Sequence, residues 1–290
     1  MIIYLYRKYI SDSWRKKIYQ LFLGKVLLIL RQSPYFLKSK IIYYFSILFP
    51  KNEYYDAYRF AGKYGITNHP FESSLIYADI LISVKYDENL PYVVHNGKRL
   101  YFPKDMSEHE IIINYRYLLI EQDVDSPHRY IDSYQRLQDK ILLDIGGAEG
   151  VFTLDAIDYI KEGYIFECQK RWIEALQRTF SPWNDKIKII RKFVGENDSD
   201  ETITLDSFLK DNYDNLHLKM DIEGSEISAL KGATNMLTRG KNISFSICTY
   251  HKKDDCNNIT SLITAMGYDY VLTKGYMYCS SMCKAICRSW

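Results

Sequence analysis

The sequence predicts an α/β protein built on a mainly parallel sheet, and three observations support this prediction. From Ile141 onward, short apolar runs typical of buried strands alternate with segments of helical period, which indicates βαβ units with helices on both faces of a sheet. A glycine-rich turn follows the first run, and carboxylates follow later ones, at the strand ends where open α/β sheets bind ligands. The 290 residues are 47% hydrophobic and 26% charged, so the chain can bury a large core.

The elements of this region follow one another in regular order. The expected strands cover residues 141–146, 163–167, 186–190, 216–221, 242–250, 268–273 and 276–279. The expected helices cover residues 150–160, 171–180, 226–237 and 259–266.

Composition and pattern divide the chain into three segments. We expect a basic amphipathic helical arm over 1–50, an accessory, substrate-side region over 51–130, and the sheet-forming domain over 131–290. Within the accessory region, Asn96-Gly97 lies between alternating apolar runs and predicts a hairpin over 92–102. Residues 74–86 predict a helix leading into irregular structure, and residues 108–122 predict a further helix.

The charge is distributed unevenly along the chain. Residues 1–50 hold nine Lys or Arg and one acid, Asp12, so this arm carries +8, and the total of +2 leaves −6 for the remainder. A nucleic-acid-binding protein should carry positive charge over its main domain, so we expect no nucleic-acid partner. The arm is better suited to an anionic membrane surface.

The apolar stretch 18–30 does not predict a membrane span or a signal peptide. Lys25 interrupts it, it is shorter than the ~20 residues of a spanning helix, and no cleavage site follows. Basic and aromatic neighbours favour either a helix on the membrane interface or an extension packed on its own domain or in a dimer. The six cysteines show no disulfide framework, which predicts a cytoplasmic protein that could be peripheral on the inner membrane face.

The last three cysteines, Cys279, Cys283 and Cys287, are spaced as on one face of a helix. This spacing raises a metal site as one interpretation, but no C-x2-C pair or histidine accompanies it. A packing face of small residues is favoured, and no metal is expected.

The turn "LLDIGGAEG" contains Asp144, Gly146, Gly147 and Gly150, and its glycines let the backbone approach a ligand closely. The dinucleotide fingerprint requires a glycine where Ile145 stands. An acid here would repel a pyrophosphate and suit a cofactor with a cationic amino group and a sulfonium. The turn therefore favours S-adenosylmethionine over NAD, with a plain glycine-rich turn as the alternative.

Glu167 ends the second strand, where an acid can accept hydrogen bonds from both ribose hydroxyls of an adenosine cofactor. An exposed loop carboxylate is the alternative. After the third strand, Val194 and Gly195 offer backbone groups to an adenine edge, and the polar residues Glu196, Asn197 and Asp198 follow.

The fourth strand ends in "KMDIEGSE", which contains Asp221, Glu223 and Glu226. Glu226 is explained most simply as a helix-start residue that the macrodipole tolerates, whereas Asp221 precedes the helix and needs another reason. We expect Asp221 in the active site, with Glu223 as a secondary candidate.

The fifth strand ends in "ICTYH", which places Tyr250 and His251 beside Asp221. Methyl transfer to a hydroxyl requires a positioned acceptor oxygen and removal of its proton. His251 is the first candidate for the base, with Asp221 orienting it or the acceptor, and a purely structural histidine is the alternative.

Taken together, "LLDIGGAEG", "FEC", "TITLDSFL", "LKMDIEGSEISALKGA" and "ICTYH" resemble the FkbM family of S-adenosylmethionine-dependent methyltransferases over about residues 140–275. The resemblance implies a Rossmann-like class I methyltransferase fold, a mostly parallel seven-stranded sheet whose last hairpin is antiparallel. It implies methylation of hydroxyls, often on bacterial surface glycans or secondary metabolites. It places the methionine part of the cofactor near Asp144, Gly146 and Gly150, and the ribose near Glu167. Cys168, which follows Glu167, is a further candidate for cofactor binding. Ala148 replaces a common glycine and Glu149 a common asparagine, so the role of Glu149 stays open.

The segment "LIEQDVDSPHRY" (119–130) lies directly before the cofactor domain and is similar to segments in a glycan-cluster subset of the family. Glu121, His128 and Arg129 are candidates for a lid or an acceptor-binding element. A polar linker, marked by Pro127, is the alternative.

The sequence therefore predicts an O-methyltransferase that acts on a sugar hydroxyl of a bacterial surface polysaccharide or its lipid-linked precursor. An NAD(P)-dependent oxidoreductase or epimerase and a non-catalytic binding module are the competing hypotheses. The sequence leaves the oligomeric state open.

Overall fold

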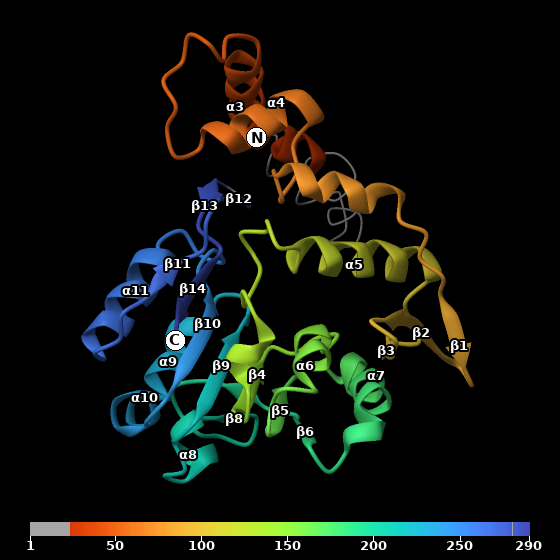
Figure 1. Ribbon diagram of the computed structural model, residues 1–290, viewed down its shortest axis with the longest axis vertical. Coiled ribbons are helices and arrows are strands. Elements are labelled where there is room, and N and C mark those ends of the chain that lie inside the picture. Colours follow the sequence, from red (N-terminus) through yellow and green to blue (C-terminus); the bar gives the residue numbers. More distant parts are fainter. Residues whose placement is uncertain (1–23, 280) are drawn as a thin grey trace, which may run out of the picture. The chain divides into compact units, whose positions relative to one another are not determined.

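The structure is a computed structural model that describes residues 24–279 and 281–290. It divides into two compact units, one containing the described residues up to Pro70 with Tyr278–Met282, and the other Phe71–Met277 with Cys283–Trp290 (Figure 1). This division cuts the accessory region expected over 51–130, most of which belongs to the second unit. The first 23 residues of the predicted arm lie outside the described residues.

The first unit is a pair of helices, α3 (Gly24–Tyr44) and α4 (Tyr55–Tyr64). They approach closely at Gly62, where a Cβ would lie 2.2 Å from the carbonyl oxygen of Ser39. The Lys40 ammonium donates a hydrogen bond of 2.8 Å to the Gly62 carbonyl. Of the helices described, none combines the length and the apolar character that crossing a membrane requires.

The second unit begins with the elements that precede the main sheet. They are η2 (Glu72–Asp79), β1 (Lys85–Asp87), β2 (Leu90–His95), β3 (Lys98–Tyr101), α5 (Glu108–Glu121) and η3 (Tyr134–Leu137). The predicted hairpin is confirmed, with Asn96 and Gly97 at φ 49° and 79° in its turn. The predicted helix over 108–122 is also confirmed as α5, which begins with a capping box between Ser107 and Glu110.

The main sheet has seven strands in the order β11-β14-β10-β9-β4-β5-β6. Their bounds are β4 (Ile141–Ile145), β5 (Glu162–Phe166), β6 (Ile187–Ile190), β9 (Leu216–Met220), β10 (Ser244–Cys248), β11 (Val271–Leu272) and β14 (Ile286–Ser289). Pairing from β6 to β10 is parallel, and β14 runs antiparallel to both β10 and β11. The predicted class I methyltransferase sheet is therefore confirmed, but the strand expected over 276–279 is wrong as its last member, because β14 takes that place and Met277–Tyr278 forms a separate two-stranded sheet with Met282–Cys283.

Helices cover both faces of this sheet (Figure 1). One face carries α6 (Val151–Ala156) and α7 (Lys170–Phe180), and the other carries α8 (Leu205–Leu209), α9 (Glu226–Lys231), α10 (Thr234–Arg239) and α11 (Asp255–Ala265). The remaining short elements are η4 (Ser181–Trp183), β7 (Phe193–Val194), β8 (Thr202–Ile203), β12 (Met277–Tyr278) and β13 (Met282–Cys283).

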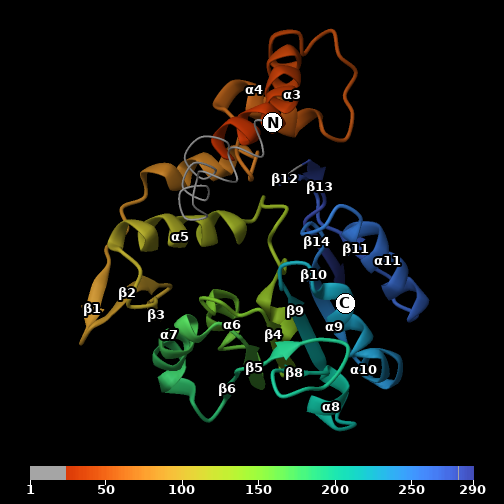
Figure 2. The ribbon, with the colours of Figure 1, turned by 180° about the vertical axis from the view of Figure 1, so that it is seen from behind.

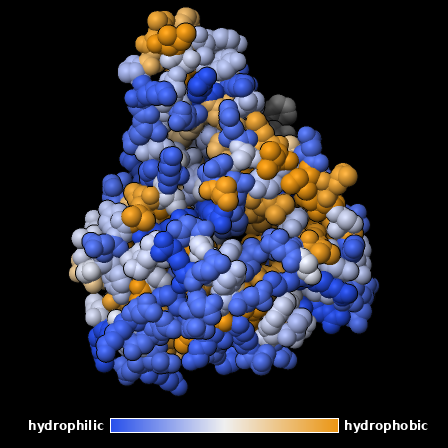
Figure 3. Space-filling view, viewed as in Figure 1, coloured by the Kyte–Doolittle hydropathy of each residue, from blue (hydrophilic) through white to orange (hydrophobic). Residues whose placement is uncertain are grey.

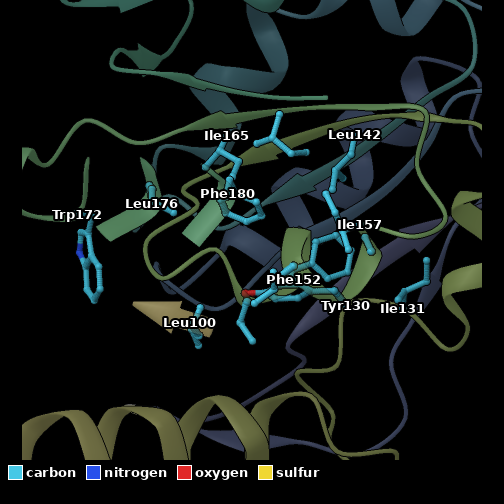
Figure 4. Packing of buried hydrophobic residues seen from close by; sticks show 14 of the residues in the cluster. Leu100, Tyr130, Ile131, Leu142, Phe152, Ile157, Ile165, Trp172, Leu176 and Phe180 are labelled. Atoms are coloured by element: carbon cyan, nitrogen blue, oxygen red, sulfur yellow. The ribbon is translucent and has the colours of Figure 1, made fainter. Parts of the chain in front are cut away.

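Alternating residues of the central strands build two separate cores. Leu142 of β4 belongs to the cluster under α6 and α7, where Phe152 and Phe180 also pack (Figure 4). Its neighbours Leu143 and Ile145 belong to the cluster on the opposite face. Burial on both faces explains why these strands read as almost continuous apolar runs.

Two further expectations differ from the structure. The single helix expected over 226–237 is divided into α9 and α10 at Gly232, where a Cβ would lie 2.0 Å from the carbonyl oxygen of Gly195. The helix face expected for Cys279, Cys283 and Cys287 is wrong, because Cys283 lies in β13 and Cys287 in β14. Pairing of β14 with β10 and β11 completes the sheet, and this tertiary pairing overrides the local spacing.

Candidate functional site

A cavity of about 650 Å³ lies where the strands β4, β5 and β9 end at their carboxyl sides, with α5 closing it. Figure 2 shows α5 above α6 and β4. The polar side chains that line the cavity are Asn114, Tyr117, Glu121, Glu149, Glu167, Gln169, Lys192, Thr202, Asp221, Glu223, Ser225 and Ser228. Its lining therefore holds five carboxylates and one ammonium, which favours a ligand with positive charge.

The turn after β4 presses tightly against the neighbouring strands. Gly146 has φ 79°, and a Cβ on it would lie 1.9 Å from the carbonyl oxygen of Asp221. A Cβ on Gly147 would lie 2.2 Å from the Ile165 side chain. Only residues without a side chain fit these two positions, so the glycines bring the backbone of the turn to the edge of the cavity.

Glu167 directly follows β5 and has both carboxylate oxygens fixed by backbone amides. The amide of Ala148 donates to Oε2 at 2.9 Å, and the amide of Gln169 donates to Oε1 at 2.7 Å. The side chain is buried and lines the cavity. A carboxylate has lone pairs for further donors, so Glu167 can also accept hydrogen bonds from hydroxyls of a ligand.

Asp144 is turned away from the cavity. Its carboxylate accepts a hydrogen bond of 2.7 Å from Thr153 and lies 3.0 Å from the ammonium of Lys219. Lys219 also donates to the Gly146 carbonyl at 2.5 Å. Burial opposes the charge of Lys219, but Asp144 and Asp221 outweigh it and raise its pKa. The buried pair of Asp144 and Lys219 therefore stabilises the turn through the Gly146 carbonyl. This differs from the expectation that Asp144 contacts a cationic cofactor.

Asp221 follows β9 and lies at the centre of a hydrogen-bonded network. Tyr130 donates to its Oδ2 at 2.6 Å, and Nε2 of His251 lies 3.1 Å from its Oδ1. Burial would raise the pKa of Asp221, but the hydrogen bond with His251 and the charge of Lys219 hold it well below its usual range. Asp221 is therefore ionised and lines the cavity.

His251 lies between two carboxylates. Its Nδ1 is 2.8 Å from Oε1 of Glu226, and its Nε2 faces Asp221, with Glu223 at 3.8 Å. Burial would lower the pKa of His251, but the nearby carboxylates of Asp221 and Glu226 raise it to about 10. At neutral pH the ring is therefore an imidazolium and has no lone pair with which to accept a proton.

Glu226 does more than begin α9. Its Oε1 also accepts hydrogen bonds from the amides of Ile222 and Gly224, at 3.0 and 3.3 Å. Burial would raise its pKa, but His251 lowers it. Glu226 thus fixes both His251 and the loop that carries Glu223, a role that capping alone did not predict.

The segment 119–130 supplies a second layer behind Asp221. His128 is hydrogen-bonded to the hydroxyl of Tyr250 at 2.9 Å, and its Nε2 is 3.9 Å from Asp221. Burial lowers the pKa of His128 to about 4, so it is neutral. Tyr130, which the sequence interpretation did not single out, is buried, and burial raises its pKa well above the ordinary value, so it remains a donor to Asp221. Its position in a polar segment just before the sheet was the available signal.

Arg129 faces elsewhere. Its Nε donates to the carbonyl of Ile131 at 2.7 Å, and the side chain lines a separate cleft of about 450 Å³ together with Lys274 and Arg288. The predicted residues that line the main cavity are Gly146, Glu149, Glu167, Cys168, Val194, Gly195, Asp221, Glu223 and Glu121. The predicted residues outside its lining are Asp144, Gly147, Gly150, His128, Arg129, Tyr250 and His251.

Glu121 and Glu149 make the upper part of the cavity acidic. Burial, with the negative charges of Asp221 and Glu149, raises the pKa of Glu121 to about 8. Burial also raises the pKa of Glu149, against a hydrogen bond of 2.7 Å that Asn114 of α5 donates to it. Asn114 was not predicted, because nothing in the sequence indicates that α5 closes the cavity.

In two sets of described residues, the ligand atoms lie close enough together to hold a metal ion. They are His128 with Asp221 and Cys248, and Asp221 with Glu226 and His251. In the second set, the imidazolium already bridges both carboxylates, so an ion would have to displace its protons.

Comparison with known proteins shows which family a part of the sheet-forming domain resembles. Residues 163–270 match the methyltransferase FkbM domain family, and this confirms the resemblance seen in the sequence. No curated protein matches the chain.

Similar solved structures include the methyltransferase FkbM from Methylobacillus flagellatus KT, with 20% identity and a TM-score of 0.44. The match covers 64% of this chain and 56% of that one, so the chain spans little more than half of the Methylobacillus protein. M. jannaschii TYW2 in complex with AdoMet is 13% identical, with a TM-score of 0.40, and the match covers 72% of this chain and 91% of that one. The Methanococcus jannaschii fibrillarin pre-rRNA processing protein is 10% identical, with a TM-score of 0.39, and the match covers 72% of this chain and 97% of that one.

Proposed function

Because residues 163–270 match the methyltransferase FkbM domain family, we propose that the protein transfers a methyl group from S-adenosylmethionine to a saccharide hydroxyl. The observation that carries this proposal is the acidic cavity at the strand ends, with Glu167 held in place by two amides. The proposed acceptor is a bacterial surface polysaccharide or its lipid-linked precursor. All six cysteines are free thiols, which supports work in the reducing cytoplasm.

The residues of the cavity suit this cofactor. S-adenosylmethionine carries a sulfonium and an ammonium against one carboxylate, and the cavity lining is predominantly acidic. Glu167 and Cys168 would lie at the ribose and Val194 at the adenine, while Gly146, Glu149 and Asp221 would lie along the cationic part. When bound, the cofactor supplies an electrophilic methyl group.

The acceptor hydroxyl must lose its proton during the transfer, and we assign this step to Glu121. This carboxylate lines the cavity, and its raised pKa of about 8 makes it more basic than an ordinary glutamate. A base whose pKa lies near the working pH is well matched to proton transfer. A cationic cofactor beside it would lower that pKa and keep Glu121 ionised at neutral pH.

His251 then has a positioning role instead of the role of base. Its positive charge lies between Asp221 and Glu226, so the ionised Asp221 keeps one fixed orientation at the cavity. Tyr130 holds the other oxygen of Asp221. Asp221 can accept a hydrogen bond from an acceptor hydroxyl and orient it for in-line attack.

The alternative of an NAD(P)-dependent oxidoreductase has less support. A pyrophosphate carries negative charge, and the turn beside the cavity contributes Glu149 close to where it would lie. A non-catalytic binding module would not need an ionised, hydrogen-bonded Asp221 at the cavity floor.

The test is methyl transfer from labelled S-adenosylmethionine into a panel of saccharides, lipid-linked and free, followed by mass spectrometry of the product. We expect one methyl group on a sugar oxygen and loss of turnover in Asp221→Asn. The exposed Asp158, whose partner is Lys98, gives the matched control Asp158→Asn, which should keep full activity. Methylation of nitrogen, or full activity of Asp221→Asn, would contradict the proposal.

A further inference from the structure

The first unit exposes a group of apolar side chains at one end of α3 and in the turn that follows. We call this group the apolar tip, and its members are Leu37, Ile41, Tyr44, Phe45, Ile47 and Leu48. Figure 3 shows hydrophobic residues gathered at this end of the first unit. The two most exposed, Ile47 and Leu48, have 97% and 76% of their surface accessible.

The apolar tip has the residue pattern of an interaction surface. Leu37, Ile41 and Tyr44 are spaced by four and three residues, so they lie on one face of α3 and lead into the apolar turn. Single exposed apolar residues are ordinary on protein surfaces, but a contiguous group marks an interaction site.

The charges around the tip indicate the kind of partner. No acidic residue occurs between Gly24 and Asn52, whereas Lys38, Lys40 and Lys51 lie on the same stretch. The next acids along the chain are the exposed Glu53 and Asp56. A surface that combines exposed aliphatic and aromatic side chains with lysines is complementary to a bilayer with anionic lipids. A second copy of the same basic tip would meet like charge, so self-association fits less well.

The structure also limits how such a membrane contact can be made. Among the helices that are described, none can span a bilayer, so binding has to be interfacial. Ile47 and Leu48 lie in a turn, where they can enter the headgroup region without a helix having to cross the membrane.

From these observations we propose that the first unit docks on an anionic membrane surface through the apolar tip, with the exposed Lys38 and Lys51 at the lipid phosphates. This inference does not depend on methyl transfer. It places an enzyme that modifies a lipid-linked acceptor on the surface where that acceptor is held.

The experiment is co-sedimentation of the full chain with vesicles of phosphatidylcholine alone and of phosphatidylcholine mixed with phosphatidylglycerol. We expect binding to the mixed vesicles, weaker binding to the neutral ones, and a loss of about tenfold or more in Leu48→Asp. Val124, in the second unit, is 77% exposed and gives the matched control Val124→Asp, which should bind like the wild type.

Two results would overturn the proposal. One is equal vesicle binding by Leu48→Asp and the wild type. The other is a wild-type oligomer that binds no vesicles and that Leu48→Asp converts to a monomer, which would make the tip a protein interface. Light scattering of both variants, with thermal melts to confirm folding, distinguishes these results from the expected one.

Discussion

Replacing His251 by glutamine tests the charge arrangement behind the cavity most sharply. The substitution keeps a polar side chain but removes the positive charge between Asp221 and Glu226. Burial raises the pKa of both carboxylates and His251 is the main group that lowers it, so without the ring Glu226 must stay ionised without its counter-charge or take up a proton, while Asp221 keeps the charge of Lys219 nearby. Removing one partner of a buried ion pair costs about 3–5 kcal/mol, so we expect the free energy of unfolding to fall by that amount at neutral pH.

The same group gives the stability a pH dependence of known sign. The pKa of His251 is raised from 6.5 to about 10 in the folded state. Its stabilisation is therefore fully present below pH 6.5 and is lost as the pH rises toward 10, at about 1.4 kcal/mol per pH unit between these values. The His251→Gln variant lacks this contribution at every pH.

Urea unfolding of both proteins across this pH range measures the effect as a difference, which removes the titration of other groups. His109, exposed on α5, supplies the control His109→Gln, which should follow the wild type. An NMR titration of the His251 imidazole provides a direct reading. A difference between variant and wild type that stays constant with pH, or an imidazole that titrates near 6.5, would refute the reasoning.

Three further substitutions test separate parts of the site. Lys219→Met leaves Asp144 buried without its partner and should cost about 3–5 kcal/mol of unfolding free energy, whereas the exposed pair lost in Lys188→Met should cost less than about 1 kcal/mol. Gly146→Ala forces a Cβ into the Asp221 carbonyl and should destabilise by more than about 2 kcal/mol in thermal melts. Gly97 has the same φ of 79° and open space around it, so Gly97→Ala should show only the backbone cost of about 1 kcal/mol, and equal losses would argue against close packing at Gly146. Glu121→Gln should lower kcat by about 100-fold with little change in cofactor affinity. An unchanged pH–rate profile in that variant would exclude Glu121 as the base.

The sheet was predictable because the information is local. The strands β4, β5 and β9 are buried on both faces, so each is a short apolar run in the sequence. The position of Glu167 was also predictable, because a carboxylate that directly follows the second strand in the sequence must lie at the end of that strand. The hairpin was equally clear, because Asn96-Gly97 supports few conformations other than a tight turn.

The chemistry of the carboxylates was less predictable because it depends on distant partners. Asp144 was expected at the cofactor, but its partner Lys219 comes from β9, a strand that pairs with β4 only in the folded sheet. His251 was expected as a base, but its protonation depends on two carboxylates that converge on it from another loop and helix. Tyr130 reaches Asp221 from a segment before the sheet, and no local pattern marks that contact.

We propose that the cavity at the strand ends binds an S-adenosyl cofactor and that Glu167 contributes to this binding. Isothermal titration of the full chain with S-adenosylhomocysteine tests it most directly. We expect micromolar binding to the wild type, a loss of about tenfold or more in Glu167→Gln, and unchanged affinity in Glu174→Gln, which alters an exposed carboxylate on α7. Absence of binding, binding of NAD in its place, or equal affinity in Glu167→Gln and the wild type would contradict the account.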